Sequence, residues 1–275
     1  HKTLDAALEN LLSSRESKGA AVDHSIGTTR RGIGPAYADK ITRATAIRMG
    51  DLLERDHLAA RLEVVTYVKN AQLLAFDPDH KPFDLDALIE EYAALGRELA
   101  PYICDTMYLL HDAMKAGKRL LFEGANACLL DVDHGTFPYV TSSNCSALGI
   151  PAGTGVPGRH IQDVIGIMKA YSTRVGAGPF PTELNNDIGN RIRERGREYG
   201  TTTGRPRRCG WPDLVAVKYS AMLCGATRLA VMLFDVLAGV DELKICTSYR
   251  LPDGSTTDRF LPDAHQLEAV TPVYE

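Results

Sequence analysis

Apolar residues in the first half of the chain recur every three or four positions, the spacing that places them on one face of a helix. This pattern predicts a helix that contains Leu4, Leu8, Leu11 and Leu12, and further helices at 38–55, 58–74 and 85–115. A basic last turn and Gly117 mark the end of the last helix. Residues 1–118 are therefore expected to form a mostly helical subdomain.

In the second half, short apolar runs alternate with helical patterns. Strands are predicted at 119–122, 164–171 and 228–234, and helices at 188–197 and 214–224. Such alternation predicts an α/β portion over 119–275, built on a mainly parallel central sheet flanked by helices. Ligands bind such sheets at the carboxyl ends of the strands. The stretch 74–86 is the best linker candidate, although it joins helices rather than domains.

Composition limits the protein classes that fit. The 275 residues are 44% hydrophobic and 24% charged, which is typical of a globular protein of one large or two modest domains. A net charge of -4 argues against a general nucleic-acid binder. No apolar run is long enough to span a membrane, and no signal peptide is evident. The six cysteines lack metal spacing and lie partly in apolar runs, which favours reduced thiols and a cytoplasmic protein.

The ends of the chain suggest a piece of something longer. The sequence begins at His1, without methionine and already inside a helical pattern, and stops shortly after a strand-like segment. We therefore expect an excised part of a larger protein.

The run from Glu198 to Asp213, EYGTTTGRPRRCGWPD, is the strongest candidate for chemistry. Its threonines offer hydroxyls, Gly204 permits close backbone approach, and its arginines match phosphates or carboxylates with two hydrogen bonds at a time. A solvated basic loop, or a local RNA-binding patch, is the alternative interpretation.

Four upstream loops also suit anions or bases, although each has a structural alternative. The glycine-rich loop at 27–35 frees backbone N–H groups, or is a simple turn. Asn126, in the 122–127 loop, suits a purine edge, or caps the backbone. The 139–144 cluster is an N-cap signal with or without a phosphate. The 169–183 segment carries Arg174 and Glu183, the latter a possible base or a salt-bridged side chain.

Asp131-Val-Asp133-His134 resembles a metal cluster, but no further ligand follows at EF-hand or zinc spacing. Metal is therefore disfavoured at this position. No Ser-His-Asp or Cys-His arrangement supports acyl-transfer hydrolysis.

Taken together and in this order, these loops resemble the adenylosuccinate synthetase family. The matching segments are GTTRRGIGPAYADK, LLFEGANACLLDVDHGTFPYVTSSN, KAYSTRVGAGPFPTE and YGTTTGRPRRCGWPDL. They are spread over most of the chain, and their joint occurrence is highly specific. The GANA and RRCGW spellings are more similar to eukaryotic members than to bacterial ones.

The resemblance implies a P-loop-NTPase-like α/β fold and a ligase of AMP biosynthesis. Such enzymes condense IMP with L-aspartate, driven by GTP with Mg²⁺, through 6-phosphoryl-IMP. The family is homodimeric, and an arginine of one subunit reaches the site of the neighbour.

The same resemblance implies roles for individual residues. The IMP-binding residues are Thr29, Arg43, Asn126, Thr141 and Val175, with Arg43 reaching the neighbouring subunit. Thr203 and Arg205 match aspartate-binding positions, and Arg207 and Asp235 match GTP-binding positions.

Two departures from the family pattern stand out. The family's glycine-rich GDEGKGK loop is absent, so no catalytic residue is expected in this chain and the Mg²⁺ ligands are expected outside it. The guanine-recognition run T-K-x-D reads Met-Leu-Phe-Asp, with Leu233 in place of the lysine and Asp235 retained. The sequence thus predicts a central fragment that is inactive alone. The alternatives are a non-catalytic nucleotide-binding or dimerisation module and, third, an RNA-binding remnant.

Overall fold

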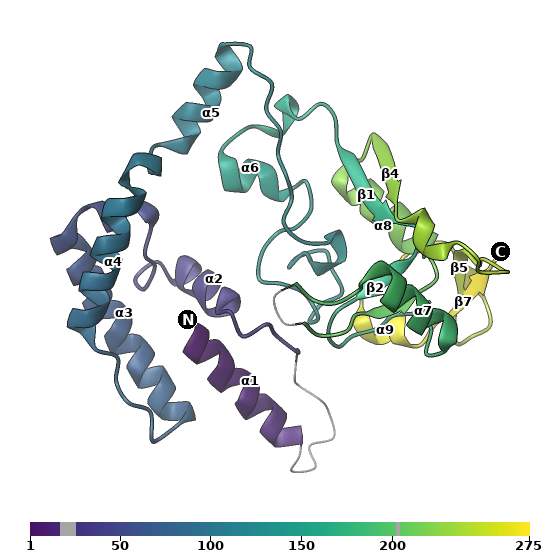
Figure 1. Cartoon of the computed structure of the whole chain (residues 1–275), viewed down its shortest axis with the longest axis horizontal. Helices are drawn as coiled ribbons and strands as arrows, with labels where there is room; N and C mark the ends of the chain where they lie inside the picture. The colour runs from purple at the N-terminus through teal and green to yellow at the C-terminus, as the bar shows by residue number, and fades with distance from the viewer. Residues whose placement is uncertain (17–25, 202–203) are drawn as a thin grey trace. The chain divides into compact units, whose positions relative to one another are not determined.

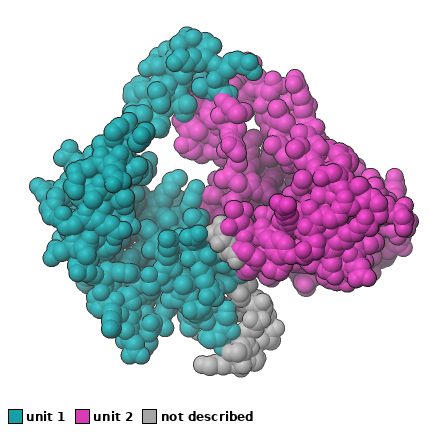
Figure 2. All heavy atoms as spheres, in the orientation of Figure 1, with its two compact units in different colours: residues 1–120 teal, residues 121–275 magenta. Residues whose placement is uncertain are grey.

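The computed structural model describes residues 1–16, 26–201 and 204–275. The chain divides into two compact units, residues 1–120 and 121–275, drawn in different colours in Figure 2. Each unit is described separately. The described secondary structure of the first unit is helical: α1 (Lys2–Glu16), α2 (Ile33–Thr42), η1 (Met49–Leu53), α3 (Arg55–Phe76), α4 (Leu85–Leu99), η2 (Ala100–Tyr102) and α5 (Thr106–Lys115).

The core of the first unit lies where α3 and α4 run side by side, with η1 against them (Figure 1). Its buried residues are Leu52, Leu58, Leu62, Ile89 and Ala93. Gly96 of α4 permits this packing, because a Cβ there would lie 2.1 Å from the Leu52 carbonyl oxygen. The elements described in this part of the chain are all helices.

Two of the predicted long helices are each interrupted in the structure. The prediction of one continuous helix over 38–55 is wrong. Helix α2 ends at Thr42, because Arg43 adopts a left-handed φ of 67°. The 85–115 prediction splits into α4 and α5 around Pro101, and Asp105 caps the new helix by accepting from Tyr108 N–H. Proline removes a backbone donor and cannot sit inside a regular helix, which explains the second break.

The second unit mixes helices and strands. Its elements are η3 (Cys128–Leu130), α6 (Gly149–Thr154), η4 (Gly158–His160), β1 (Ile165–Lys169), β2 (Ser172–Arg174), α7 (Asp187–Gly196), β3 (Arg208–Gly210), α8 (Leu214–Cys224), β4 (Arg228–Met232), η5 (Phe234–Leu237), β5 (Cys246–Arg250), β6 (Thr256–Thr257), α9 (Ala264–Glu268) and β7 (Thr271–Tyr274). The α/β class is confirmed.

Within the described residues, the strands form three small sheets. The parallel pair β1–β4, in register from Ile165 opposite Arg228, is the parallel pairing that the alternating pattern predicts. The other pairings, β2–β3 and β6–β5–β7, are antiparallel. Two cores support them, one between α7, β3 and η5, and one beneath α8 with β5 and α9.

The predicted strand at 119–122 does not form, because no described segment pairs with it. A strand needs a partner for its backbone groups, and here Leu121 is 93% exposed. The β1–β4 pair is also less buried than an apolar run suggests, since Ile167 is 78% exposed.

Two further sequence predictions concern thiols and membranes. The six cysteines are free thiols, but only Cys209 and Cys246 are fully buried and Cys104 is exposed. Among the described residues, no helix is both long enough and apolar enough to cross a bilayer.

Candidate functional site

The antiparallel pair β2–β3 brings two of the candidate loops of the second unit together. Thr173 pairs with Cys209 and Arg174 with Arg208, so the turn that follows β2 lies beside the loop that precedes β3. Val175 is on that turn and is 38% exposed, while Arg207 immediately precedes β3. These two predicted ligand-binding residues are therefore neighbours in space.

A buried carboxylate, Glu198, lies at the centre of this region. Its side chain accepts hydrogen bonds from Lys169 Nζ at 2.6 Å, Tyr171 Oη at 2.5 Å and Arg207 Nη1 at 2.7 Å. Burial alone would raise the pKa of Glu198, but these three donors outweigh it and hold the pKa below its usual value. Glu198 is thus an anion paired with two cations. We call these four residues the Glu198 cluster.

The backbone of the arginine loop folds back on itself. Arg207 N–H donates to the Glu198 carbonyl at 2.8 Å, and Gly200 N–H donates to the Arg205 carbonyl at 2.8 Å. A bridge between Tyr199 and Pro206 completes the closure. Arg205 is half-buried in this loop, and the predicted aspartate-binding Thr203 lies outside the described residues.

Arg208 behaves differently from its neighbour Arg207. Its guanidinium binds Glu183 through Nε at 2.8 Å and Nη2 at 2.6 Å, and Nη1 donates to the Gly178 carbonyl at 2.7 Å. The donors of Arg208 are thus used within the protein, where they tie the loop together. Glu183 is salt-bridged, the more ordinary of its two interpretations.

Asp131 organises the loops around Thr141. It is fully buried, and its carboxylate accepts from the backbone N–H groups of Asp133, His134, Cys145 and Ser146. Burial would raise the pKa of Asp131, but these backbone donors lower it overall. Thr141 is held alongside, because its N–H donates to the Leu130 carbonyl at 2.9 Å.

The 139–144 cluster was expected to cap a helix, and it does not. The next helix, α6, begins at Gly149 and is preceded by Leu148, which makes no side-chain cap. The polar side chains instead fold against Asp131 and its neighbours, as when Asn144 Nδ2 donates to Asp133 at 2.7 Å. The capping motif was a local signal that long-range contacts override.

Asn126 and Arg174 link the remaining loops of the second unit. Asn126 is exposed, and its loop lies beside the Asp131 region: burial raises the pKa of the Cys145 thiol, and the nearby Asn126 side chain opposes that shift. Arg174 donates to Thr136 Oγ1 at 3.2 Å and to the Tyr139 and Ala177 carbonyls. Burial, followed by the nearby Arg208, lowers the pKa of Arg174 to about 10. The loops that carry Asn126, Thr141 and Val175 are thus linked in one polar framework.

Asp235 lies in η5, just after β4, where a ligand would meet the carboxyl end of a parallel strand. Its side chain is exposed, and its backbone carbonyl accepts from Arg195 Nη2 at 2.8 Å. Leu233, which replaces the family lysine, adopts a left-handed φ of 63° at this turn. Such a conformation is uncommon for a bulky residue and is strained.

In the first unit, the glycine-rich loop that carries Thr29 is bound to α1. Gly32 N–H donates to Asp5 at 2.8 Å, and Gly27 N–H donates to Glu9 at 2.8 Å. Both carboxylates are buried. The expectation that these glycine amides face a ligand is therefore wrong, since protein carboxylates occupy them, whereas Thr29 itself is exposed.

Arg43 directly follows α2, on a turn that is fixed by a second buried carboxylate, Asp39. Asp39 accepts from His1 Nε2 at 2.6 Å, Thr45 Oγ1 at 2.7 Å and Lys69 Nζ at 2.7 Å. We call these four residues the Asp39 cluster. The Arg43 side chain is exposed.

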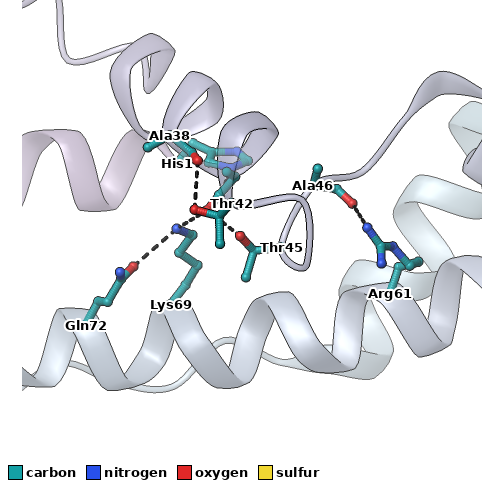
Figure 3. Close-up of polar contacts among 9 residues, drawn as sticks. His1, Ala38, Thr42, Thr45, Ala46, Arg61, Lys69 and Gln72 are labelled. Carbon is teal, nitrogen blue, oxygen red and sulfur yellow. Dashed lines mark hydrogen bonds and ion pairs between the residues drawn. The ribbon is translucent and has the colours of Figure 1, made fainter.

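The backbone on either side of this turn is also held. Arg61 Nη2 donates to the Arg43 carbonyl at 3.1 Å and to the Ala46 carbonyl, the second of which Figure 3 draws. The turn that presents Arg43 is therefore fixed at both its side chains and its backbone.

Within the described ranges, no three His, Cys, Asp or Glu side chains gather closely enough to hold a metal ion. Asp131, the first residue of the suspected metal cluster, instead directs its oxygens at backbone N–H groups and Asn144. The described residues therefore do not fit a magnesium site by themselves.

Sequence reasoning missed the two buried carboxylates that support the arginines. Glu198 precedes the arginine loop and resembles any acidic residue at a helix end, and Asp39 resembles a surface helix residue. Their partners, such as Lys169 and Lys69, are distant in sequence, so only the fold reveals them.

The fold and loops define an α/β protein in which polar and arginine-bearing loops gather around β2, β3 and the end of β4. Comparison with known proteins identifies the family. The model of the adenylosuccinate synthetase family matches residues 1–275, and the chain belongs to that family.

Individual relatives agree with this assignment. The chain is 46% identical to the adenylosuccinate synthetase of Caldicellulosiruptor bescii over 275 residues, all of this chain and 62% of that protein. It is 49% identical to that of Exiguobacterium sibiricum over 260 residues, 94% of this chain and 59% of that protein. The chain thus spans about three fifths of the length of these relatives. Both are bacterial, so the expectation of a eukaryote-like member is not supported.

A solved structure supports the fold assignment. The chain is similar to fully ligated adenylosuccinate synthetase from Plasmodium falciparum, with a TM-score of 0.89 and 33% identity, over all of this chain and 62% of that one. The family fold that the motifs implied is therefore confirmed.

Proposed function

We propose that this chain is the central part of an adenylosuccinate synthetase, which joins IMP and L-aspartate at the expense of GTP. The family match over the whole chain carries this proposal. In the proposed reaction the γ-phosphoryl group of GTP moves to the 6-oxygen of IMP. The amine of aspartate then attacks C6, the C–O bond breaks and phosphate leaves, which forms a C–N bond.

The described residues would bind and orient the substrates rather than transfer protons. Thr141, Asn126 and Val175, on the linked loops of the second unit, would hold IMP. Thr29 would contact the IMP phosphate from the first unit. The threonine hydroxyls suit a phosphate, the Asn126 amide suits a base edge, and the apolar Val175 suits the face of a ribose.

The arginine loop would hold the other two substrates. Arg205, with Thr203, would bind the aspartate carboxylate, and Arg207 would bind the nucleotide triphosphate. Asp235 would accept hydrogen bonds from guanine. An arginine remains charged at any physiological pH, which suits a group that must hold an oxyanion without exchanging a proton.

Partners and location complete the proposal. Arg43 would reach the site of a second subunit, so that a homodimer completes each site. The proton-transfer residues and the Mg²⁺ ligands would lie outside this chain, and we therefore expect the chain alone to be inactive. We place the reaction in the cytoplasm.

The direct test is an Arg205→Ala substitution in the full-length enzyme. We expect the KM for aspartate to rise about tenfold or more, because a charge-assisted carboxylate contact is lost. The KM for IMP should change less than twofold. Steady-state kinetics with each substrate varied in turn gives both values, and equal losses for both substrates would contradict the assignment.

The alternative is a non-catalytic nucleotide-binding or dimerisation module. The two candidates differ in whether the parent protein carries the family's GDEGKGK loop. A parent protein that lacks this loop, and that binds IMP without forming adenylosuccinate, would favour the module over the enzyme.

A further inference from the structure

We propose that Glu198 is a positioning residue that holds Arg207 and Lys169 side by side, so that both cations bind the phosphates of the nucleotide substrate. This inference rests on the proposed function. It adds Lys169 to the anion-binding groups and assigns Glu198 the role of fixing their geometry.

The two cations share one carboxylate. Lys169 Nζ lies 2.6 Å from Oε1 of Glu198, and Arg207 Nη1 lies 2.7 Å from Oε2. Because the two oxygens belong to one planar group, the ammonium and the guanidinium are near neighbours. Glu198 itself is 1% exposed, whereas each cation retains 28% of its side-chain surface in solvent. An arriving anion would thus meet the cations and not the carboxylate.

The charge balance favours an anionic ligand. Two cations and one carboxylate leave a net charge of +1 on the Glu198 cluster, and Tyr171 adds a neutral donor. Without the carboxylate, two like charges at this separation would repel, and the flexible Lys169 would move away first. With it, both head groups are held before the ligand binds, which lowers the entropic cost of binding.

The remaining donors are consistent with this role. Among the hydrogen bonds of the described residues, the guanidinium of Arg207 bonds through Nη1 alone. Lys169 uses two partners, Glu198 and Thr173 Oγ1 at 3.2 Å. Since an ammonium has three N–H groups and a guanidinium five, donors remain for phosphate oxygens.

The adjacent ion pair provides a matched comparison. Arg208 also binds a carboxylate, Glu183, but it does so in a bidentate way and directs its third nitrogen to the Gly178 carbonyl. Arg208 therefore serves the loop, whereas Arg207 is held by one nitrogen and presents the rest. Glu183→Gln removes the carboxylate that pairs with Arg208. It leaves Lys169 and Arg207, the proposed phosphate-binding pair, unchanged.

The test compares Glu198→Gln with Glu183→Gln in the full-length enzyme, with GTP, IMP and aspartate each varied in turn. We expect Glu198→Gln to raise the KM for GTP about tenfold, the loss of one charge-assisted contact, with less than twofold change for IMP. Glu183→Gln should leave the ratio of the two KM values unchanged. Thermal unfolding of both variants would serve as the control for folding: each should unfold in a cooperative transition like that of the wild type.

A double variant separates positioning from mere packing. In Glu198→Gln with Lys169→Met, the ammonium that moves away in the single variant is already absent, so we expect the KM for GTP to match that of Glu198→Gln and to rise no further. A Glu198→Gln enzyme whose KM values all rise together, or whose KM for GTP does not change, would overturn the inference. If the wild-type full-length enzyme forms no adenylosuccinate, the proposed function fails instead, and the two failures are distinct.

Discussion

The Asp39 and Glu198 clusters both place a buried carboxylate beside an arginine, but the carboxylate contacts different groups in each. Each is a buried carboxylate that accepts three side-chain hydrogen bonds, and each lies next to an arginine with a proposed ligand role. In the second unit, Arg207 is itself a partner of the carboxylate. In the first, no bond is described between the Arg43 guanidinium and the Asp39 carboxylate; the Arg43 N–H donates to the Asp39 carbonyl oxygen at 2.9 Å, and the carboxylate fixes the turn through Thr45.

This difference predicts which property each carboxylate controls. Lys69 is almost fully buried, with 7% of its side chain exposed, whereas Lys169 and Arg207 each keep 28%. Loss of Asp39 therefore leaves the Lys69 ammonium buried without a counter-charge. Loss of Glu198 leaves two cations that water still reaches. We expect Asp39 to act mainly on stability and Glu198 mainly on ligand affinity.

The largest expected effect follows from Asp39→Asn. An amide cannot neutralise the buried Lys69 ammonium, and an uncompensated buried charge costs about 3–5 kcal/mol of unfolding free energy. In chemical denaturation monitored through the helix content, the midpoint should move to a lower denaturant concentration. The double variant Asp39→Asn with Lys69→Met should recover much of the loss, because the stranded charge is removed. A single variant as stable as the wild type would show that the cluster is dispensable.

Local elements were predictable where their signals lie close in sequence. The α8 prediction, 214–224, matches the structure because Asp213 accepts from Ala216 N–H at its start and Gly225 adopts a left-handed φ of 62° at its end. The 119–122 strand failed because strand formation depends on a partner, which no local pattern reports.

The site was predictable only in part, and for the same reason. Motifs located the loops, and β2–β3 brings Val175 and Arg207 together. The resemblance assigns a role to Arg207 and none to Arg208, but the contacts that distinguish the two side chains depend on Glu198 and Glu183, which are brought to them only by the fold. Nor did the sequence show that Asp5 and Glu9 occupy the amides of the glycine-rich loop.

Acid should weaken the Glu198 cluster with a defined sign. The pKa of Glu198 is lowered in the folded protein, so its ionised form adds stability above its unfolded pKa of about 4.5, and this is lost as pH falls through the folded value. We expect a smaller loss than for Asp39→Asn, because water reaches both cations once the carboxyl is protonated.

The measurement is the unfolding free energy of wild type and Glu198→Gln from pH 7 to pH 3. The difference between them should be constant at neutral pH and should shrink below about pH 4.5. A difference that grows on acidification would mean that the folded pKa is raised, and the cluster would then not be ionic.

The smallest effect is expected for Tyr171→Phe, which removes one neutral donor and leaves both cations on Glu198. Loss of a hydrogen bond to a charged group should lower the unfolding free energy by about 1 kcal/mol. Because Lys169 and Arg207 stay paired, the KM for GTP of the full-length enzyme should remain within twofold of wild type. Thermal unfolding and steady-state kinetics on one preparation test both parts. A stability loss with unchanged KM would leave the positioning of the two cations to the Glu198 carboxylate, whereas a large rise in KM would show that the tyrosine hydroxyl contributes to it.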